Sequence, residues 1–178
     1  MKSLKFYTSI LMLLVTVTVF SQNEKDQKII SDAEKAKSKL INTDEGLNNF
    51  FSNSSGYVIF PNVGEGALII GGASGNGAVY ENGTLVGMAS LKKVDVGLQA
   101  GGQEITEVIF FETEDALNEF KQGEYKFTAE ASAIAVEKGA AKNANYSDGV
   151  IVFTKPKKGL MADLSIGGQK FNYKPIHK

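Results

Sequence analysis

The sequence contains no cysteine and no arginine, and it has a single histidine. Without cysteine the fold gains nothing from disulfides, and thiolate catalysis and cysteine-based metal sites are excluded. The one histidine, His177, stands beside the end of the sequence, a poor place for a positioned base. A serine nucleophile would lack its usual imidazole partner, and a zinc site would need carboxylates alone. The composition therefore disfavours an enzyme, and we expect no cofactor and no metal.

The absence of arginine also limits how the chain can meet phosphate. All 19 basic residues are lysines, which act as point charges and cannot form the bidentate fork of a guanidinium group. Lysine and acidic residues nearly balance, with a formal net charge of −1 at pH 7. This balance excludes a nucleic-acid binder by bulk charge.

Residues 1–21 have the pattern of a secretory signal. Lys2 and Lys5 precede an apolar run from Ile10 to Phe20 that is too short to cross a bilayer as a helix. The small side chains of Val19 and Ser21 predict cleavage after Ser21, which would leave Gln22 as the new N-terminus. We therefore expect an exported protein, periplasmic or secreted. The remaining segment, 22–178, has the size of one domain and can bury roughly 70% of its unfolded surface.

Three segments have helical patterns. Between residues 24 and 41, Ile29, Ala33, Ala36 and Leu40 recur at helical spacing and predict one apolar face. A second, short helix is expected from a cap at Asp44, with Leu47, Phe50 and Phe51 buried and an end before Ser54. A third is expected over 114–121, because Thr113 is a suitable cap and Gly123 a suitable end.

Short apolar segments between turn residues predict strands over much of the rest. Asn82-Gly83 favours a two-residue hairpin turn between two of them. We expect Pro61 to end the first strand, and Gly71–Gly77 to be a glycine-rich turn because it lacks a nucleotide-loop motif. The expected strands are 57–60, 67–70, 77–81, 84–88, 94–98, 107–112, 127–135, 150–154 and 160–166. The fold class is then α+β, with N-terminal helices packed on a twisted, mainly antiparallel sheet that curls toward a barrel or a sandwich.

Two lysine clusters are candidate binding sites. Lys155, Lys157 and Lys158 lie in an expected turn, where each could contribute roughly 1 kcal/mol toward anionic head groups. The alternative is a solvated turn that protects a sheet edge. The second cluster, on the first helix, is Lys25, Lys28, Lys35 and Lys39. That helix either docks on the core with a solvated lysine face or lies on a membrane surface, although Glu24, Asp26, Asp32 and Glu34 nearly cancel its charge.

The order and spacing of several segments resemble the SYLF domain family over roughly residues 30–173. The segments are Gly56-Tyr-Val-Ile-Phe-Pro61, Gly71–Gly77 with its hairpin, Gly97–Gln103, Glu107–Glu112 with the helix after it, and Lys158-Gly159-Leu160 leading to Ser165. The resemblance implies a lipid-binding domain. Eukaryotic members bind phosphoinositides and some bind actin, and bacterial members occur as exported proteins.

From the resemblance and the lysine clusters we expect a peripheral protein that binds anionic phospholipid or another envelope lipid. Actin and phosphoinositides are not the expected partners of an exported chain, and no nucleic acid is expected. The alternative is a non-enzymatic structural or interaction protein with a protein partner in the cell envelope.

Overall fold

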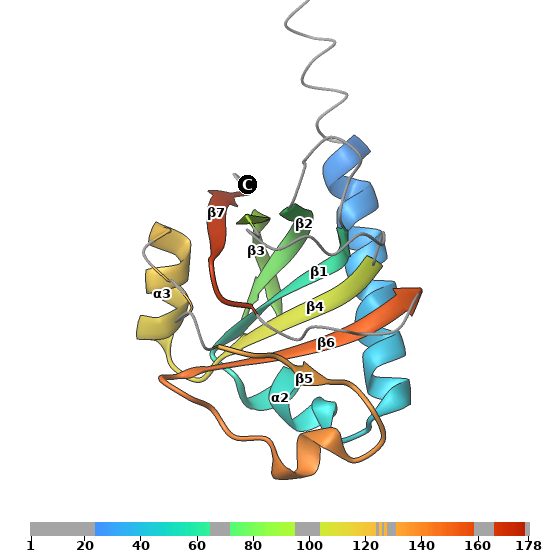
Figure 1. Ribbon diagram of the computed structural model, residues 1–178. Helices are drawn as coiled ribbons and strands as arrows, with labels where there is room; N and C mark the ends of the chain where they lie inside the picture. Colours follow the sequence, from blue (N-terminus) through green and yellow to red (C-terminus); the bar gives the residue numbers. More distant parts are fainter. Residues whose placement is uncertain are drawn as a thin grey trace, which may run out of the picture.

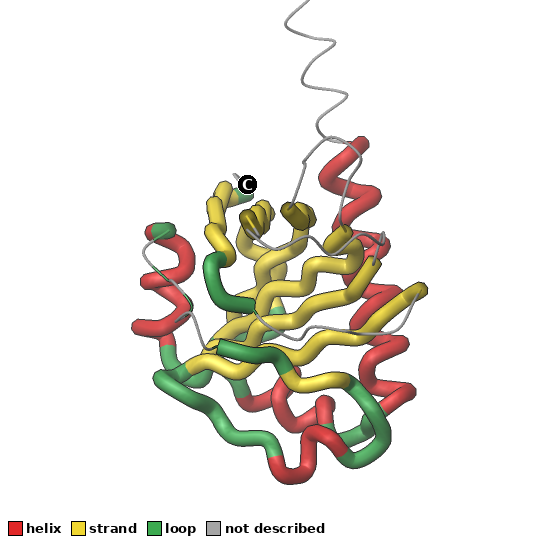
Figure 2. The backbone as a smooth tube through the Cα atoms, viewed as in Figure 1, coloured by secondary structure: helices red, strands yellow, loops and turns green. Residues whose placement is uncertain are grey.

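A computed structural model describes residues 24–64, 72–94, 104–123, 125, 127, 131–158 and 166–176. Its centre is one twisted seven-stranded sheet (Figures 1 and 2). The strands are β1 Gly56–Gly64, β2 Gly72–Glu81, β3 Thr84–Val94, β4 Glu104–Phe111, β5 Ile134–Ala135, β6 Val150–Lys158 and β7 Gln169–Pro175. Residues 24–43 form a long helix, followed by α2 Leu47–Asn53, α3 Glu114–Gln122 and the 3₁₀ turn η1 Ala140–Asn143.

The sheet is mixed but mostly antiparallel. Its strand order is β5-β6-β4-β1-β2-β3-β7, and only the short β5–β6 pair is parallel. β5 and β7 are the two edges of this described sheet, so it is open and neither closes into a barrel nor divides into a sandwich. The expected α+β class, with helix packed on a mainly antiparallel sheet, is confirmed.

Both faces of the sheet are buried, because successive side chains of a strand point to opposite faces. Tyr57 and Ile59 of β1 share one core with Ala33, Ala36 and Leu40 of the long helix. Val58 and Phe60 lie in a second core with Leu117 and Phe120 of α3. A strand covered on both faces reads as a continuous apolar run, which explains the pattern of β1 and of the centre of β4.

The sheet curls over its second face. The ring centroids of Phe60 in β1 and Phe171 in β7 are 6.0 Å apart, although β2 and β3 lie between these strands in the sheet order. Glycine permits this curvature: a Cβ atom on Gly77 would lie 2.5 Å from the carbonyl oxygen of Ile59. The prediction of a turn over Gly71–Gly77 was wrong, since residues 72–77 belong to β2.

Local signals placed other elements correctly. β2 and β3 meet at Asn82-Gly83, whose φ angles are 49° and 76°. Helix α3 begins after Thr113, whose hydroxyl accepts a hydrogen bond from the Ala116 amide at 3.2 Å. The helix ends at Gly123, which has a left-handed conformation with φ 74°.

Three strand predictions need correction. β1 continues through Pro61 to Gly64, because a register shift between Ile59 and Asn62 accommodates the proline. In the described part of the strand expected over 127–135, only Ile134–Ala135 forms a named strand, β5, which pairs with β6. β7 was not predicted. Of the remaining expected strands, 67–70 lies outside the described residues, and so do 95–98 and 160–165.

Candidate functional site

The long N-terminal helix carries lysines on its solvent-facing side. Successive residues of an α-helix are rotated by about 100° around its axis. Four of the lysines therefore lie within an arc of roughly 80°, beside the buried face formed by Ala33, Ala36 and Leu40. All four side chains are exposed. We call them the lysine stripe: Lys25, Lys28, Lys35 and Lys39.

Asp32 lies inside the lysine stripe and neutralises part of it. Its carboxylate is 2.8 Å from the Nζ atom of Lys28 and 3.6 Å from that of Lys35. The hydrogen bond from Lys28 lowers the pKa of Asp32. Lys25 and Lys39 form no ion pair within the described chain, so their charges are the most available to a ligand.

Two side chains join the helix to the sheet below it. The hydroxyl group of Tyr80 donates a hydrogen bond to the Glu34 carboxylate at 2.6 Å. Lys37 donates to the Tyr57 hydroxyl at 2.9 Å, and its Nζ atom lies 5.0 Å from the centroid of that ring. Glu34 and Lys37 therefore have structural partners and do not belong to the exposed lysine surface.

The second predicted cluster does not form a turn. Lys155, Lys157 and Lys158 are part of β6, which continues to Lys158 along β4. A register shift opposite Glu104 and Ile105 accommodates Pro156, so the proline does not end the strand. The expectation of a projecting basic turn was wrong for this reason.

One of these strand lysines, Lys155, nevertheless lies on the face that the N-terminal helix covers. Strand alternation places Lys155 on the same face as Phe153, which belongs to the core beneath that helix. The Nζ atom of Lys157 is 3.5 Å from the Glu104 carboxylate and also donates a hydrogen bond to the side chain of Asn62. Lys157 is thus partly neutralised, and Lys155 is only partly exposed.

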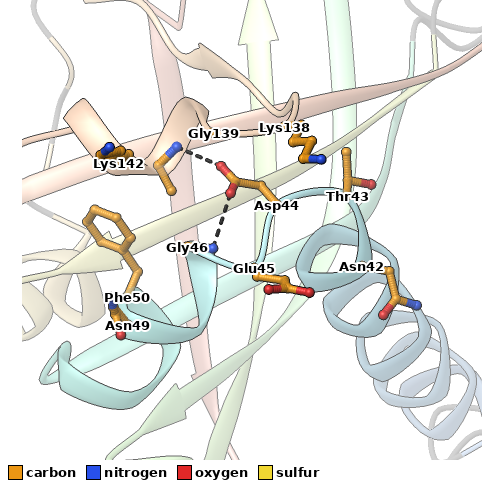
Figure 3. A pocket seen from close by; sticks show the side chains of 11 residues that line it. Asn42, Thr43, Asp44, Glu45, Gly46, Asn49, Phe50, Lys138, Gly139 and Lys142 are labelled. Atoms are coloured by element: carbon orange, nitrogen blue, oxygen red, sulfur yellow. Dashed lines mark hydrogen bonds between the residues drawn. The ribbon is translucent and has the colours of Figure 1, made fainter.

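A pocket of about 870 Å³ lies where the long helix ends (Figure 3). One wall is the segment from the helix end to the start of α2, and the other is the loop that leads into η1. Polar and charged side chains line most of it, with Phe50 as an aromatic wall. Its polar and charged lining includes Asn42, Asp44, Glu45, Lys138 and Lys142.

Asp44 holds the two walls of this pocket together. Its Oδ1 atom accepts a hydrogen bond from the Gly46 amide at 3.1 Å, and its Oδ2 atom accepts one from the Ala141 amide at 2.7 Å (Figure 3). The side chain is buried, with 5% of its surface exposed. The N-cap residue of α2 is Gly46, which makes no side-chain cap bond. The expectation that Asp44 caps this helix was therefore wrong. Asp44 instead links the segment before α2 to the η1 turn.

The lysine stripe leads toward this pocket. Lys39 lies one helical turn before Asn42 and Thr43, and its direction around the helix falls between theirs. Lys138 and Lys142 on the opposite wall are exposed. Neither was singled out from the sequence, because nothing in their spacing shows that the fold brings them to the helix end.

A carboxyl group is buried on the other face of the sheet. Burial raises the pKa of Glu107 to about 7, although a hydrogen bond from the Gln169 amide, at 3.0 Å, and the nearby charge of Lys93 act in the opposite direction. The second carboxylate oxygen of Glu107 has no hydrogen-bond partner, and neither does the hydroxyl of Thr154 opposite it in β6. This cluster faces the interior of the sheet's second core.

Within the described ranges, no group of histidine, cysteine, aspartate and glutamate side chains could hold a metal ion. None of the helices in the same ranges is long and apolar enough to cross a membrane. The predicted signal segment, 1–21, and His177 lie outside the described residues.

The fold is an α+β domain whose long N-terminal helix carries an exposed row of lysines. Residues 92–174 match a family model named Ysc84 and described as "Las17-binding protein actin regulator". Over these residues the match confirms the resemblance to the SYLF domain family, also named Ysc84, which is associated with lipid binding.

A relative supports this assignment. Beta cell expansion factor A from Aeromonas veronii is 27% identical to the chain over 142 residues. The aligned region covers 78% of this chain and 53% of the relative. The chain therefore spans about half the length of the relative that it matches.

Proposed function

We propose that the protein binds lipid surfaces peripherally and recognises anionic head groups through the lysine stripe. The observation that carries the proposal is the position of Lys25, Lys28, Lys35 and Lys39 on one exposed arc of a helix. The apolar side of the same helix is already buried against the sheet. The helix therefore offers charge to a membrane and does not offer an apolar face for insertion.

The family match supports the same function. SYLF domains are associated with lipid binding and are generally non-catalytic binding domains. The signal pattern of residues 1–21 leads us to propose export, periplasmic or secreted, with anionic phospholipid or another envelope lipid as the target. Lys155, Lys157 and Lys158 form a second proposed contact region, weakened by the pairing of Lys157 with Glu104.

The first test is sedimentation of residues 22–178, which include every described element, with vesicles of phosphatidylcholine alone and with the same vesicles carrying an anionic phospholipid. We expect binding to anionic vesicles only, and weaker binding as salt is raised, because screening shortens the range of charge attraction. Equal binding to both vesicles, or none to either, would contradict the proposal.

Variants assign the contact surface. Changing Lys25 and Lys39 to glutamate removes the two unpaired stripe lysines. At roughly 1 kcal/mol for each lysine lost, vesicle affinity should fall at least about 30-fold. The matched control changes Lys170 and Lys174, which are exposed on β7, and alters net charge equally. A similar loss in both pairs would show that bulk charge, and not the stripe, controls binding.

The strand lysines have their own test. Changing Lys155, Lys157 and Lys158 to glutamate should weaken vesicle binding less than the stripe variant does, because Lys157 already has acidic and amide partners. Unchanged binding would remove these three residues from the contact surface and leave the function in place.

A second candidate is a structural or interaction protein of the cell envelope. The observation in its favour is the open edge at β7, whose side chains at 172 and 174 are exposed and whose backbone could pair with another strand. A specific crosslink from β7 to one envelope protein, together with no vesicle binding, would favour this candidate.

A further inference from the structure

The pocket at the end of the long helix has charges of opposite sign on its two walls. Lys138 and Lys142 come from the loop around η1, and Glu45 comes from the segment before α2 (Figure 3). These three side chains are exposed and make no ion pair with one another or with any other group of the described chain. The pocket therefore presents two ammonium groups and a carboxylate that are all free to meet a ligand.

The remaining acidic residue of the pocket does not compete for the lysines. Both carboxylate oxygens of Asp44 accept hydrogen bonds from backbone amides. These bonds fix the two walls of the pocket relative to each other. Glu45 and the two lysines therefore stay on opposite walls when no ligand is bound. The carbonyl end of the 24–43 helix adds partial negative charge on the same side as Glu45.

We propose that this pocket binds a zwitterionic amine-phosphate group of the phosphoethanolamine type. The phosphate is placed at Lys138, and the ammonium group at Glu45 and the helix end. Lys142 lies on the other side of Asp44 (Figure 3) and adds positive charge to the same wall of the pocket. The volume of about 870 Å³ is within the range of ligand sites, roughly 300–1,000 Å³, and leaves room for the rest of a head group.

A ligand with one sign of charge fits this pocket less well. A free phosphate gains from the two lysines but is opposed by Glu45 and by the helix end. A free amine gains from Glu45 and is opposed by the lysines. Only a ligand that carries both charges a few bonds apart satisfies both walls.

This inference rests on the proposed lipid-binding function for the source of the ligand, but its chemistry can be tested separately. Calorimetric titration of residues 22–178 would use phosphoethanolamine, inorganic phosphate and ethanolamine as three soluble probes. We expect phosphoethanolamine to bind roughly tenfold more tightly than either fragment. Binding of phosphate that equals or exceeds binding of phosphoethanolamine would overturn the inference.

Three variants assign the walls. Glu45→Gln should weaken phosphoethanolamine roughly fivefold while strengthening free phosphate, because it removes only the carboxylate. Lys138→Gln with Lys142→Gln should weaken both probes. Lys170→Gln, exposed on β7, is the matched control and should change neither. Parallel loss of phosphate and phosphoethanolamine in Glu45→Gln would indicate a general disturbance and overturn the assignment.

Vesicles distinguish the source of the ligand. Phosphocholine also carries both charges, but its quaternary ammonium group cannot donate a hydrogen bond to Glu45. Phosphatidylcholine vesicles with added phosphatidylethanolamine should therefore retain more protein than phosphatidylcholine alone, and Glu45→Gln should abolish this difference. Binding to anionic vesicles without any response to phosphoethanolamine would overturn this inference and leave the proposed function standing. Binding of soluble phosphoethanolamine without retention on any vesicle would support the pocket and contradict the lipid-surface function.

Discussion

Replacing Asp44 by asparagine is a direct test of how the pocket is built. The carboxylate accepts from the Gly46 amide at 3.1 Å and from the Ala141 amide at 2.7 Å, and it is buried. Asparagine has the same shape but only one acceptor oxygen, so one of the two amides would face an NH₂ group. That amide would lose its partner and meet a second donor.

The expected cost follows from these two bonds. A hydrogen bond to a charged group contributes about 1.5–3 kcal/mol, and a buried donor left without an acceptor costs about 1–3 kcal/mol. We expect Asp44→Asn to lower the free energy of unfolding by about 2–3 kcal/mol. The bond to Ala141 joins residues 97 positions apart, so the loop around η1 should also lose its fixed position against the helix end.

Urea unfolding of residues 22–178, followed by circular dichroism, measures this change. For a urea slope of about 2 kcal/mol/M, the midpoint should fall by about 1 M or more. Glu45→Gln is the matched control, because Glu45 is the adjacent exposed residue and its substitution should stay within about 0.5 kcal/mol. An Asp44→Asn variant that is as stable as this control would refute the role assigned to the carboxylate.

Three further predictions concern the core. Because burial raises the pKa of Glu107 from 4.5 to about 7, the unfolded chain loses this proton at lower pH than the folded one. Glu107 therefore lowers the free energy of unfolding progressively from about pH 4.5 to about pH 7, by about 3 kcal/mol in total, and has no further effect at higher pH. Glu107→Gln should remove this pH dependence of the free energy of unfolding. An unchanged pH dependence would contradict the assignment. Gly77→Ala should lower the free energy of unfolding by about 1–3 kcal/mol, because the new Cβ atom would lie 2.5 Å from the Ile59 carbonyl oxygen. The control is Asn76→Ala on the same strand, which changes an exposed side chain and should hardly alter thermal unfolding. Tyr80→Phe should cost about 1–3 kcal/mol in urea unfolding, because the Glu34 carboxylate loses its 2.6 Å hydrogen bond, and a neutral result would show that water replaces it.

Elements with local signals could be predicted from the amino-acid sequence. The apolar spacing over Ala33, Ala36 and Leu40 was enough for the long helix, since a helix closes its hydrogen bonds within a few residues. Asn82-Gly83 was enough for the hairpin, because these residues accept the positive φ angles that its turn requires. The lysine stripe could be predicted for the same reason: the helix period alone places its members on one arc.

The tertiary structure alone decided the features that depend on distant partners. β6 runs through Pro156 to Lys158 because β4 lies beside it with a register shift, which the lysine-rich segment does not reveal. Residues 72–77 are part of β2, where the backbone of β1 lies too close to Gly75 and Gly77 for larger side chains. The pocket exists because Asp44 binds an amide 97 residues away and so brings Lys138 and Lys142 opposite Glu45. Such contacts arise from packing between segments far apart in the chain, and no local pattern of residues encodes them.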